Sequence, residues 1–460
     1  VGNLLTPIEM VRYLDVVGNT SFTLETIENG VTRVFYIDAT AIGSQENFST
    51  ALLSNGYIIN YKMINPLREY ITRAIQHLVS TQGVTLNHKS LGFYEESPGK
   101  PVFLLKNTST AHGISRYYNP DFQFTKGSSE KYMDFLDKEI LPFNETRLAL
   151  VIGLSGVISS YLKEYADVQT ILTNFCGPSS TGKTTVSQFI ASLWASPKVS
   201  NSSLVKTFNS TNLARFDGIE GYNGVPIIFD DATSGSNINR KDLIYQLALG
   251  ESRARMANYG KSVKQGLNWS GVAIITSESS LLSETTLTTG QVARIINFDT
   301  ICWTQDGAHS KRIKNAIKDN YGHLGQLFVT ELFKTKSREQ IITTYNDSFK
   351  EIETAQVNKD SLSDRLISKL AIIHTTAKLA NEVLDIELSP DIIKDTLIEI
   401  DKAEAESRNP GFKALEVLKD YIVKHHKNFN KKGIHGLKSQ HSNGVLLCDM
   451  TFDFNTVEIR

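Results

Sequence analysis

One short stretch limits the fold of this chain more than any other. Residues 175–185 read FCGPSSTGKTT, and they lie between the apolar run VQTILTNF (168–175) and the helix-like TTVSQFIASLW (184–194). Glycines and small hydroxylated residues contribute little to a core, so the backbone of this turn is expected to serve another purpose. The stretch fits the pattern G-x-x-x-x-G-K-[ST], whose amide groups surround phosphate oxygens.

A phosphate loop explains each residue type in the stretch. Glycines let successive N–H groups converge on an anion, and the dipole of the following helix adds to the attraction. We expect Lys183 to reach the β- and γ-phosphates of ATP and the Thr184 hydroxyl to bind Mg²⁺. The predicted ATP-binding residues are Gly177, Pro178, Ser179, Ser180, Thr181, Gly182, Lys183, Thr184 and Thr185.

The alternative is a chance match in a loop rich in glycine and serine. At average residue frequencies, such a match is expected in roughly a few per cent of chains of this length. The strand-like run before the loop and the helix-like run after it favour the nucleotide site, because this context is the one that the motif requires.

A triphosphate site also needs a carboxylate from another strand end. VPIIFDD (225–231) ends an apolar run in Asp230 and Asp231. We expect Asp230 to hold Mg²⁺ and Asp231 to orient the attacking water as a base. Taken alone, two aspartates after a strand are usually a loop or a helix cap, and the phosphate loop is what favours the functional interpretation.

A third polar strand end follows in GVAIIT (271–276), which ends in Thr276. At the carboxyl edge of a nucleotide-binding sheet, this hydroxyl can bond the γ-phosphate or its water, although threonine is also common at strand ends. The order of phosphate loop, acidic pair and polar strand end is typical of ATPases with an additional strand rather than of small-molecule kinases.

Composition narrows the class of protein. The 460 residues carry a net charge of −1 with 40% hydrophobic residues, typical of a globular chain of two or three domains without a general attraction to polyanions. Cys176, Cys302 and Cys448 lack metal-ligand spacing and predict reduced thiols and a cytoplasmic location. Residues 148–162 are apolar but too short for a bilayer, so no membrane contact is expected. No signal peptide is visible, and because the chain begins at Val1 we expect a natural start further upstream.

The texture of the sequence changes along the chain. Residues 1–125 mix strand and helix signals, including a hairpin of KSLGFYEE and PVFLL around SPGK, and predict an α+β domain. Residues 126–305 alternate apolar strands with helices, which predicts an α/β core with a parallel sheet and helices on both faces. Residues 306–405 are helical, and 406–460 contain one more helix and turn-rich, strand-like segments.

Two basic features stand out in this near-neutral chain. Segment 250–271 carries Arg253, Arg255, Lys261 and Lys264 against Glu251 alone. A hairpin with its tip near residues 259–261 would present Arg255, Lys261 and Lys264 to a DNA backbone, whereas the alternative is a solvated loop. The tail 424–438, KHHKNFNKKGIHGLK, is a second basic segment, for which duplex DNA and plain solvation are both open.

Arg294 lies in GQVAR just before the strand-like IINFD (295–299). In that place its guanidinium can reach the γ-phosphate held by a neighbouring subunit. The alternative is an arginine that only supports the local surface.

With these parts in order, residues 168–299 resemble an AAA+ ATPase, and more closely the MCM-like replicative helicases of mobile elements such as staphylococcal cassette chromosomes and pathogenicity islands. The similarity covers nearly the whole chain. It rests on the following segments: GPSSTGKTT with a helix ending in Trp194, NSTNLARF, YQLALGESRAR, Trp269, TSES, GQVARI, GFYEE with PVFLL, and SDRLISKLAIIHTTAKLANEVL.

The resemblance implies a homo-hexameric ring that hydrolyses ATP with Mg²⁺ at subunit interfaces and translocates on single-stranded DNA in its pore. It implies that Arg294 is a trans arginine finger, Thr276 is sensor 1, residues 255–269 form a pore hairpin, and Arg365 is a second sensor. It further implies a helical lid (306–405) and a winged-helix-like segment (406–460). The family usually has Asp-Glu where this chain has Asp230-Asp231, and a shorter carboxylate predicts slower hydrolysis.

Two other functions remain open on the sequence alone. A ring ATPase that loads or remodels a protein–DNA complex would need the same phosphate-loop residues without a DNA-tracking hairpin. A monomeric P-loop kinase is disfavoured by the acidic pair, the helical segment and Arg294.

Overall fold

The structure is a computed structural model in which most of the chain is described. The description covers residues 5–13, 20–28, 30–97, 100–110, 113–117, 119, 121–208, 211–232, 240–253, 255–256, 263–264, 267–281, 293–299, 301–355, 363–408, 418, 421–422, 429–431, 444–446 and 457–458. Lys261 and nearly all of the basic tail therefore lie outside the described residues.

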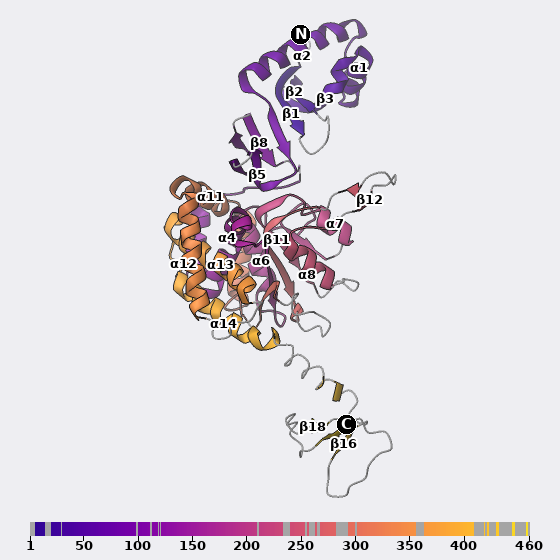
Figure 1. The fold of residues 1–460 in the computed structure, drawn as a ribbon. Helices are drawn as coiled ribbons and strands as arrows, with labels where there is room; N and C mark the ends of the chain where they lie inside the picture. The colour runs from indigo at the N-terminus through magenta and orange to yellow at the C-terminus, as the bar shows by residue number, and fades with distance from the viewer. Residues whose placement is uncertain are drawn as a thin grey trace.

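A seven-stranded sheet forms the centre of the molecule (Figure 1). Along its main path the order is β15-β9-β14-β11-β5-β6, and β10 pairs with the same strand as β5, β11. All of these pairs are parallel except the β5–β6 hairpin. The strands are β5 (Leu91–Ser97), β6 (Lys100–Leu104), β9 (Thr170–Cys176), β10 (Val205–Thr207), β11 (Tyr222–Asp230), β14 (Ser270–Ser277) and β15 (Ile295–Phe298).

The apolar runs in the sequence become the middle of this sheet. Every residue of β9 and β14 is buried, as parallel strands covered on both faces require. Helices α4 (Asn144–Tyr161) and α6 (Lys183–Ser192) pack on β11 and β14, and α8 (Arg240–Leu249) packs on β9. Helix α4 contains the apolar run 148–162 up to Tyr161, with Leu162 as its C-cap, and is buried almost throughout, so this run is a core helix.

A second sheet lies at the N-terminal end of the chain (Figure 1). Its order is β3-β2-β1-β4-β8-β7, and α1 (Gln45–Ser54) and α2 (Ile64–Gln82) pack against it around a separate core. The strands are β1 (Thr6–Tyr13), β2 (Thr20–Glu28), β3 (Val31–Asp38), β4 (Thr85–His88), β7 (Thr108–Thr110) and β8 (Gly113–Tyr117).

The predicted hairpin of residues 91–104 is present, but it joins the central sheet rather than this one. Its strand β5 pairs with β11 through Leu91–Tyr222 and Gly92–Asn223. The approach at this contact is close: a Cβ on Gly92 would lie 1.9 Å from the carbonyl oxygen of Asn223, and the φ of Gly92 is +95°.

Helices follow the last strand of the central sheet and stack beside the core (Figure 1). The first part of the helical region predicted at 306–405 is divided into two helices by a turn at 320–323, which is tied to the end of α6 by a hydrogen bond from Gly322 N to Ser192 O (2.7 Å). The helices of this part are α10 (Gly307–Asp319), α11 (Leu324–Thr335), α12 (Arg338–Ala355), α13 (Ser363–Leu384) and α14 (Pro390–Arg408).

The core region and the C-terminal end also contain shorter helices and strands. Short helices α3 (Ser129–Glu139), α5 (Lys163–Ala166) and α7 (Asn212–Asp217) belong to the core region, and β12 (Arg255–Met256) pairs with β13 (Val263–Lys264). Near the C-terminus, β16 (Phe429–Lys431), β17 (Gly444–Leu446) and β18 (Val457–Glu458) form a small sheet. The helix expected at 414–427 lies mostly outside the described residues.

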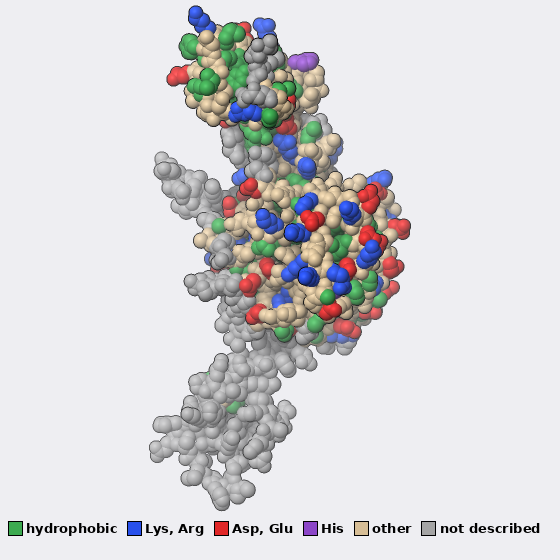
Figure 2. All heavy atoms as spheres, turned by 180° about the vertical axis from the view of Figure 1, so that it is seen from behind, with side chains coloured by type: hydrophobic (Ala, Val, Ile, Leu, Met, Phe, Trp, Pro, Cys, Tyr) green, Lys and Arg blue, Asp and Glu red, His purple; other side chains and the backbone are tan. Residues whose placement is uncertain are grey.

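The chain is a mixed α/β protein, as the sequence predicts. No helix in the described ranges combines the length and apolar character needed to cross a bilayer. Cys176 is a buried free thiol and Cys302 an exposed one, while Cys448 falls outside the description. Side chains of both charge signs are interspersed over the core surface (Figure 2), in keeping with the net charge of −1.

We predict that Gly92→Ala detaches the β5–β6 hairpin from the central sheet. The added methyl group cannot coexist with the Asn223 carbonyl, so the substitution should lower the free energy of unfolding of the core by about 3 kcal/mol. Trp194 stacks on Phe103 of β6 with ring centroids 5.8 Å apart, so urea unfolding followed by tryptophan fluorescence measures the effect. Gly43→Ala is the control, because nothing lies within 4 Å of its added Cβ; equal stability of both variants would contradict the prediction.

Candidate functional site

The loop between β9 and α6 has the backbone of an anion-binding turn. Gly177, Ser180 and Gly182 all have positive φ, of 137°, 71° and 86°. At Gly182 a Cβ would also lie 2.6 Å from Thr304 Oγ1, so glycine is needed here on two counts. The Trp303 amide donates to Thr181 O (2.8 Å) and fixes the loop against the segment after β15.

The Lys183 side chain curls back over this loop. Its Nζ donates to the carbonyl oxygens of Gly177 (2.8 Å) and Pro178 (2.7 Å). These bonds hold the ammonium group close to the turn, and Lys183 lines the adjoining pocket. Such an arrangement concentrates positive potential on a bound anion.

One carboxylate oxygen joins three parts of the sheet edge. Asp230 Oδ1 accepts hydrogen bonds from Thr276 Oγ1 (2.6 Å) and from Thr184 Oγ1 (3.1 Å). These residues come from the end of β11, the end of β14 and the start of α6. The structure thus brings together the acidic strand end, the polar strand end and the phosphate loop that the sequence predicted separately.

Asp231 follows directly and takes an unusual backbone conformation, with φ of 59°. Its amide donates to Thr276 Oγ1 (2.8 Å), and the next amide, of Ala232, donates to Thr276 O (2.8 Å). Left-handed φ is costly for aspartate, and these two bonds hold it there. The Asp231 side chain is exposed and lines the same pocket as the loop.

The pocket at this edge has a volume of about 550 Å³, suited to a nucleotide-sized ligand. It contains most of the predicted residues and several that sequence reasoning missed, which come from the strand end after Thr276 and from the segment that enters α10. The missed residues are Ser277, Glu278, Thr304, Asp306, Gly307, Ser310 and Lys314. Asp306, which caps α10 by accepting from His309 N (2.6 Å), was the one sequence signal available.

The donor set fits Mg²⁺ better than a transition metal. The described residues contain no group of three or more His, Cys, Asp or Glu side chains placed to hold a metal. Asp230 and Thr184 bring a carboxylate and a hydroxyl within hydrogen-bond distance of each other in the pocket lining. Mg²⁺ is typically bound by one or two protein oxygens together with phosphate oxygens and waters.

The basic segment 250–271 forms an antiparallel pair, as predicted. Arg255 lies opposite Lys264 in the β12–β13 hairpin. At the base of this hairpin, an isolated bridge pairs Glu251 with Asn268. Trp269 anchors the base: it is buried, and its ring stacks on Phe216 at a centroid distance of 5.2 Å. The predicted tip with Lys261 is outside the described residues, as are the side chains of Arg255 and Lys264.

Arg294 lies at the opposite edge of the sheet from the phosphate loop. The next residue, Ile295, pairs with Leu172 near the start of β9, and the loop begins at Gly177. At about 3.3 Å per residue, this separation is about 17 Å along the strand. The Arg294 guanidinium stands 5.0 Å from the centroid of the Tyr245 ring in α8.

A buried lysine, also missed from the sequence, holds the backbone at Arg294. Lys369 Nζ in α13 donates to the carbonyl oxygens of Ala293 (3.1 Å) and Arg294 (2.7 Å). Burial, together with the nearby charges of Arg294 and Arg365, lowers the pKa of Lys369 to about 7. Arg365 is exposed, one turn before Lys369, and is not among the described residues lining the phosphate pocket.

Comparison with protein-family models identifies the family of this chain. The model of a family described as a domain of unknown function (DUF927) matches residues 37–267, half of the chain and the part that holds the loop and Asp230. The chain belongs to the DUF927 family. No curated protein sequence matches this DUF927 protein.

A solved structure named "SCCmec type IV Cch - active helicase" is similar to this DUF927 protein. The TM-score is 0.74 at 22% sequence identity, over 97% of this chain and 83% of the other. At that level of identity the likeness establishes a shared fold, and it does not by itself carry an activity across.

We predict that Gly182→Ala abolishes ATP binding at the loop. The methyl group would meet Thr304 and force the turn out of its left-handed conformation, so affinity should fall at least about a hundredfold, or about 2.7 kcal/mol. Anisotropy of a fluorescent ATP analogue measures it. Ser180→Gly, in the same loop and also at positive φ, should bind as the unaltered protein does; comparable affinity for both variants would show that the loop geometry is not what holds phosphate.

Proposed function

We propose that this protein is an ATP-dependent DNA helicase with an AAA+ core that works as a homo-hexameric ring during replication of a mobile genetic element. The observation that carries the proposal is the convergence on Asp230 of the hydroxyls of Thr184 and Thr276, beside a phosphate loop that also holds Lys183. The shared fold with a structure named an active helicase supports it.

The order of the central strands supports the AAA+ core. Strand β14 lies between β9, which leads into the phosphate loop, and β11, which ends in Asp230. An inserted strand of this kind is what the additional-strand class of ATPases requires. We further propose the division into an N-terminal domain (1–125), an ATPase core (126–305), a helical lid (306–405) and a winged-helix-like segment (406–460).

Hydrolysis would use the residues of the pocket in distinct roles. The loop amides and Lys183 bind the β- and γ-phosphates, and Thr184 with Asp230 would hold Mg²⁺, which lowers the charge on the transferred phosphoryl group. Asp231 accepts a proton from the attacking water and orients it. Thr276 holds both aspartates in position through its hydrogen bonds to the Asp230 carboxylate and the Asp231 amide.

The position of Arg294 favours action between subunits. It lies about 17 Å along the sheet from its own phosphate loop, further than an arginine side chain extends. In a ring, the edge that carries Arg294 can face the phosphate edge of the next subunit. Arg365 lies on the same side as Arg294, close enough to act on the pKa of Lys369, so we assign both guanidinium groups to the neighbour's nucleotide.

Single-stranded DNA would contact the β12–β13 hairpin in the pore. The paired backbone places Arg255 opposite Lys264, and the rigid base at Trp269 holds the hairpin out from the core (Figure 1). Basic side chains on such an extension are suited to a phosphate backbone. The basic tail at 424–438 is proposed as a duplex contact.

A mixing experiment tests the action of Arg294 between subunits. Lys183→Ala and Arg294→Ala should each abolish DNA-stimulated ATP hydrolysis. Mixed in equal amounts before assembly, they restore interfaces in which Lys183 and Arg294 come from different intact subunits, and random mixing should recover about a quarter of the original rate.

The matched control mixes Lys183→Ala with Asp231→Asn. Both changes lie in the same subunit's pocket, so no interface of this mixture is intact and no activity should return. Recovery in the control as well, or in neither mixture, would rule out Arg294 as a finger supplied by the neighbour.

Strand displacement tests the hairpin and the activity together. On forked duplexes with 3′ or 5′ tails, the unaltered protein should unwind one polarity with ATP. Lys261→Ala/Lys264→Ala should keep its basal ATPase and lose displacement, because the β12–β13 hairpin and the phosphate pocket lie at opposite ends of the strands of the sheet. ATPase without displacement in the unaltered protein would favour the loading or remodelling function, and normal unwinding by the double variant would disprove the pore assignment.

A further inference from the structure

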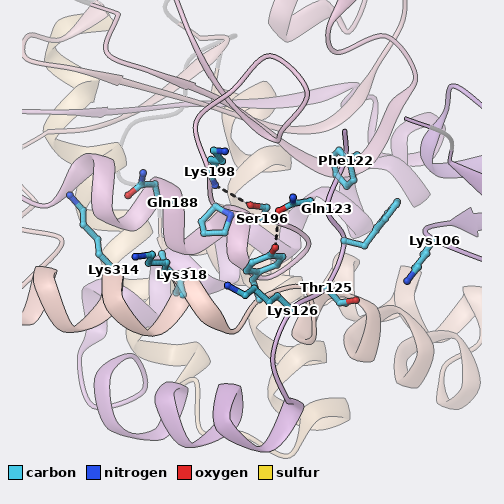
Figure 3. Close-up of a pocket in the computed structure, with 14 residues that line it drawn as sticks. Lys106, Phe122, Gln123, Thr125, Lys126, Gln188, Ser196, Lys198, Lys314 and Lys318 are labelled. Carbon is cyan, nitrogen blue, oxygen red and sulfur yellow. Dashed lines mark hydrogen bonds between the residues drawn. The ribbon is translucent and has the colours of Figure 1, made fainter. Parts of the chain in front are cut away.

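A second hollow, larger than the phosphate pocket, lies beside α10 (Figure 3). Its volume is about 820 Å³. Five lysines line it, Lys106, Lys126, Lys198, Lys314 and Lys318, and none of the described residues in its lining is acidic. We call it the lysine groove. In a chain of net charge −1, five convergent cations mark a site for a polyanion.

The lysines are available to a ligand. All five are exposed. Among the described residues, only Lys126 takes part in an ion pair, with Asp319 at 2.6 Å, and that pair is itself exposed. Asp319 pairs with Lys126, and none of the other four lysines has an ion-pair partner among the described residues, so a bound polyanion would relieve the repulsion that remains between them.

The floor of the groove is rigid. Segment 122–126 is held on one side by the bond from Ser196 N to Gln123 O (2.9 Å) and on the other by the paired backbones of Lys126 and Tyr321. Tyr321 also donates from its hydroxyl to Gln123 Oε1 (3.1 Å). A preformed floor lowers the entropy cost of binding an extended ligand.

The groove is elongated and adjoins the phosphate pocket. Figure 3 shows Lys314 and Lys106 at opposite ends, with Lys126, Lys198 and Lys318 between them. Lys314 also lines the phosphate pocket. Helices α6 and α10 both begin at that pocket and pack side by side, and Gln188 of α6 and Lys318 of α10 continue into the groove.

From this geometry we propose that the lysine groove binds the backbone of a single DNA strand on the core, at a site separate from the β12–β13 hairpin. Lysines spaced along an elongated hollow match the repeated phosphates of a strand. Phe124, half-buried at the floor, together with Gln123 and Gln188 provides an apolar and amide surface for the bases. A free nucleotide presents the same phosphate chemistry and would use only part of the length.

The test compares two pairs of neutralised lysines in the full chain. Lys198→Gln/Lys318→Gln removes two groove cations that do not line the phosphate pocket. Lys311→Gln/Lys350→Gln removes two exposed lysines that line neither hollow, one of them on the same helix α10. Affinity for a fluorescent oligo-dT is measured across a salt series, with AMP and pyrophosphate as separate competitors.

The groove variant should lose two phosphate contacts. The slope of log K against log salt should become shallower by about 1.4, which at 0.1 M salt is about a twenty-fivefold weaker affinity if binding is equal at 1 M. The control pair and the basal ATPase should be unchanged. If unlabelled oligo-dT displaces the fluorescent oligo-dT and AMP and pyrophosphate do not, the ligand of the groove is a DNA strand. If pyrophosphate displaces it at a similar concentration, the strand proposal is wrong and the groove binds a small phosphate ligand.

Lysine acetylation of the unaltered protein gives a second readout without substitutions. Oligo-dT should protect Lys198 and Lys318 and leave Lys311 reactive. If Lys198 and Lys318 stay reactive with oligo-dT bound, while Lys261→Ala/Lys264→Ala loses DNA binding, the groove proposal is wrong and the helicase proposal stands. If the unaltered protein binds no DNA at all, both fail.

Discussion

The whole candidate site depends on one carboxylate oxygen, Oδ1 of Asp230. It accepts from Thr184 at the start of α6 and from Thr276 at the end of β14, and it belongs to the end of β11. These three segments are far apart in the sequence. They meet at one edge of the sheet because β9, β14 and β11 are parallel and in register: Thr276 pairs with Phe175, and Phe229 pairs with Ile275. A shift of one residue in either pairing would turn these side chains to the other face.

The opposite edge of the same sheet has a different character. There β14 begins beside the hairpin base at Trp269, and β15 begins beside Arg294. The parallel arrangement thus separates two groups of residues by the length of a strand: the candidate phosphate site at the carboxyl ends, and Arg294 with the base of the β12–β13 hairpin at the amino ends. Under the proposed function, this separation would leave Arg294 available to a neighbouring subunit rather than to its own loop.

The parts of the site that could be predicted are those with local signals. The phosphate loop, Asp230 and Thr276 each follow an apolar run that ends in polar residues, and the hairpin 255–264 follows from its basic, turn-containing segment. Lys314 and Thr304 could not be predicted, because they reach the pocket only when the chain returns after β15. The same holds for Lys369, whose partners lie more than seventy residues earlier in the chain. The β5–β6 hairpin was visible locally, but its pairing with β11 across the sheet was not.

Strand β14 connects the base of the hairpin to the candidate site. It is eight residues long and buried at every position, and it runs from the hairpin base to the hydroxyl that holds both aspartates. A buried parallel strand cannot stretch or slip by part of a residue, since both of its ladders would have to break together. A displacement of the β14 backbone at Thr276 would therefore also displace the hairpin base at Trp269. Under the proposed function, β14 would act as a rigid connection between the nucleotide site and the DNA-binding hairpin.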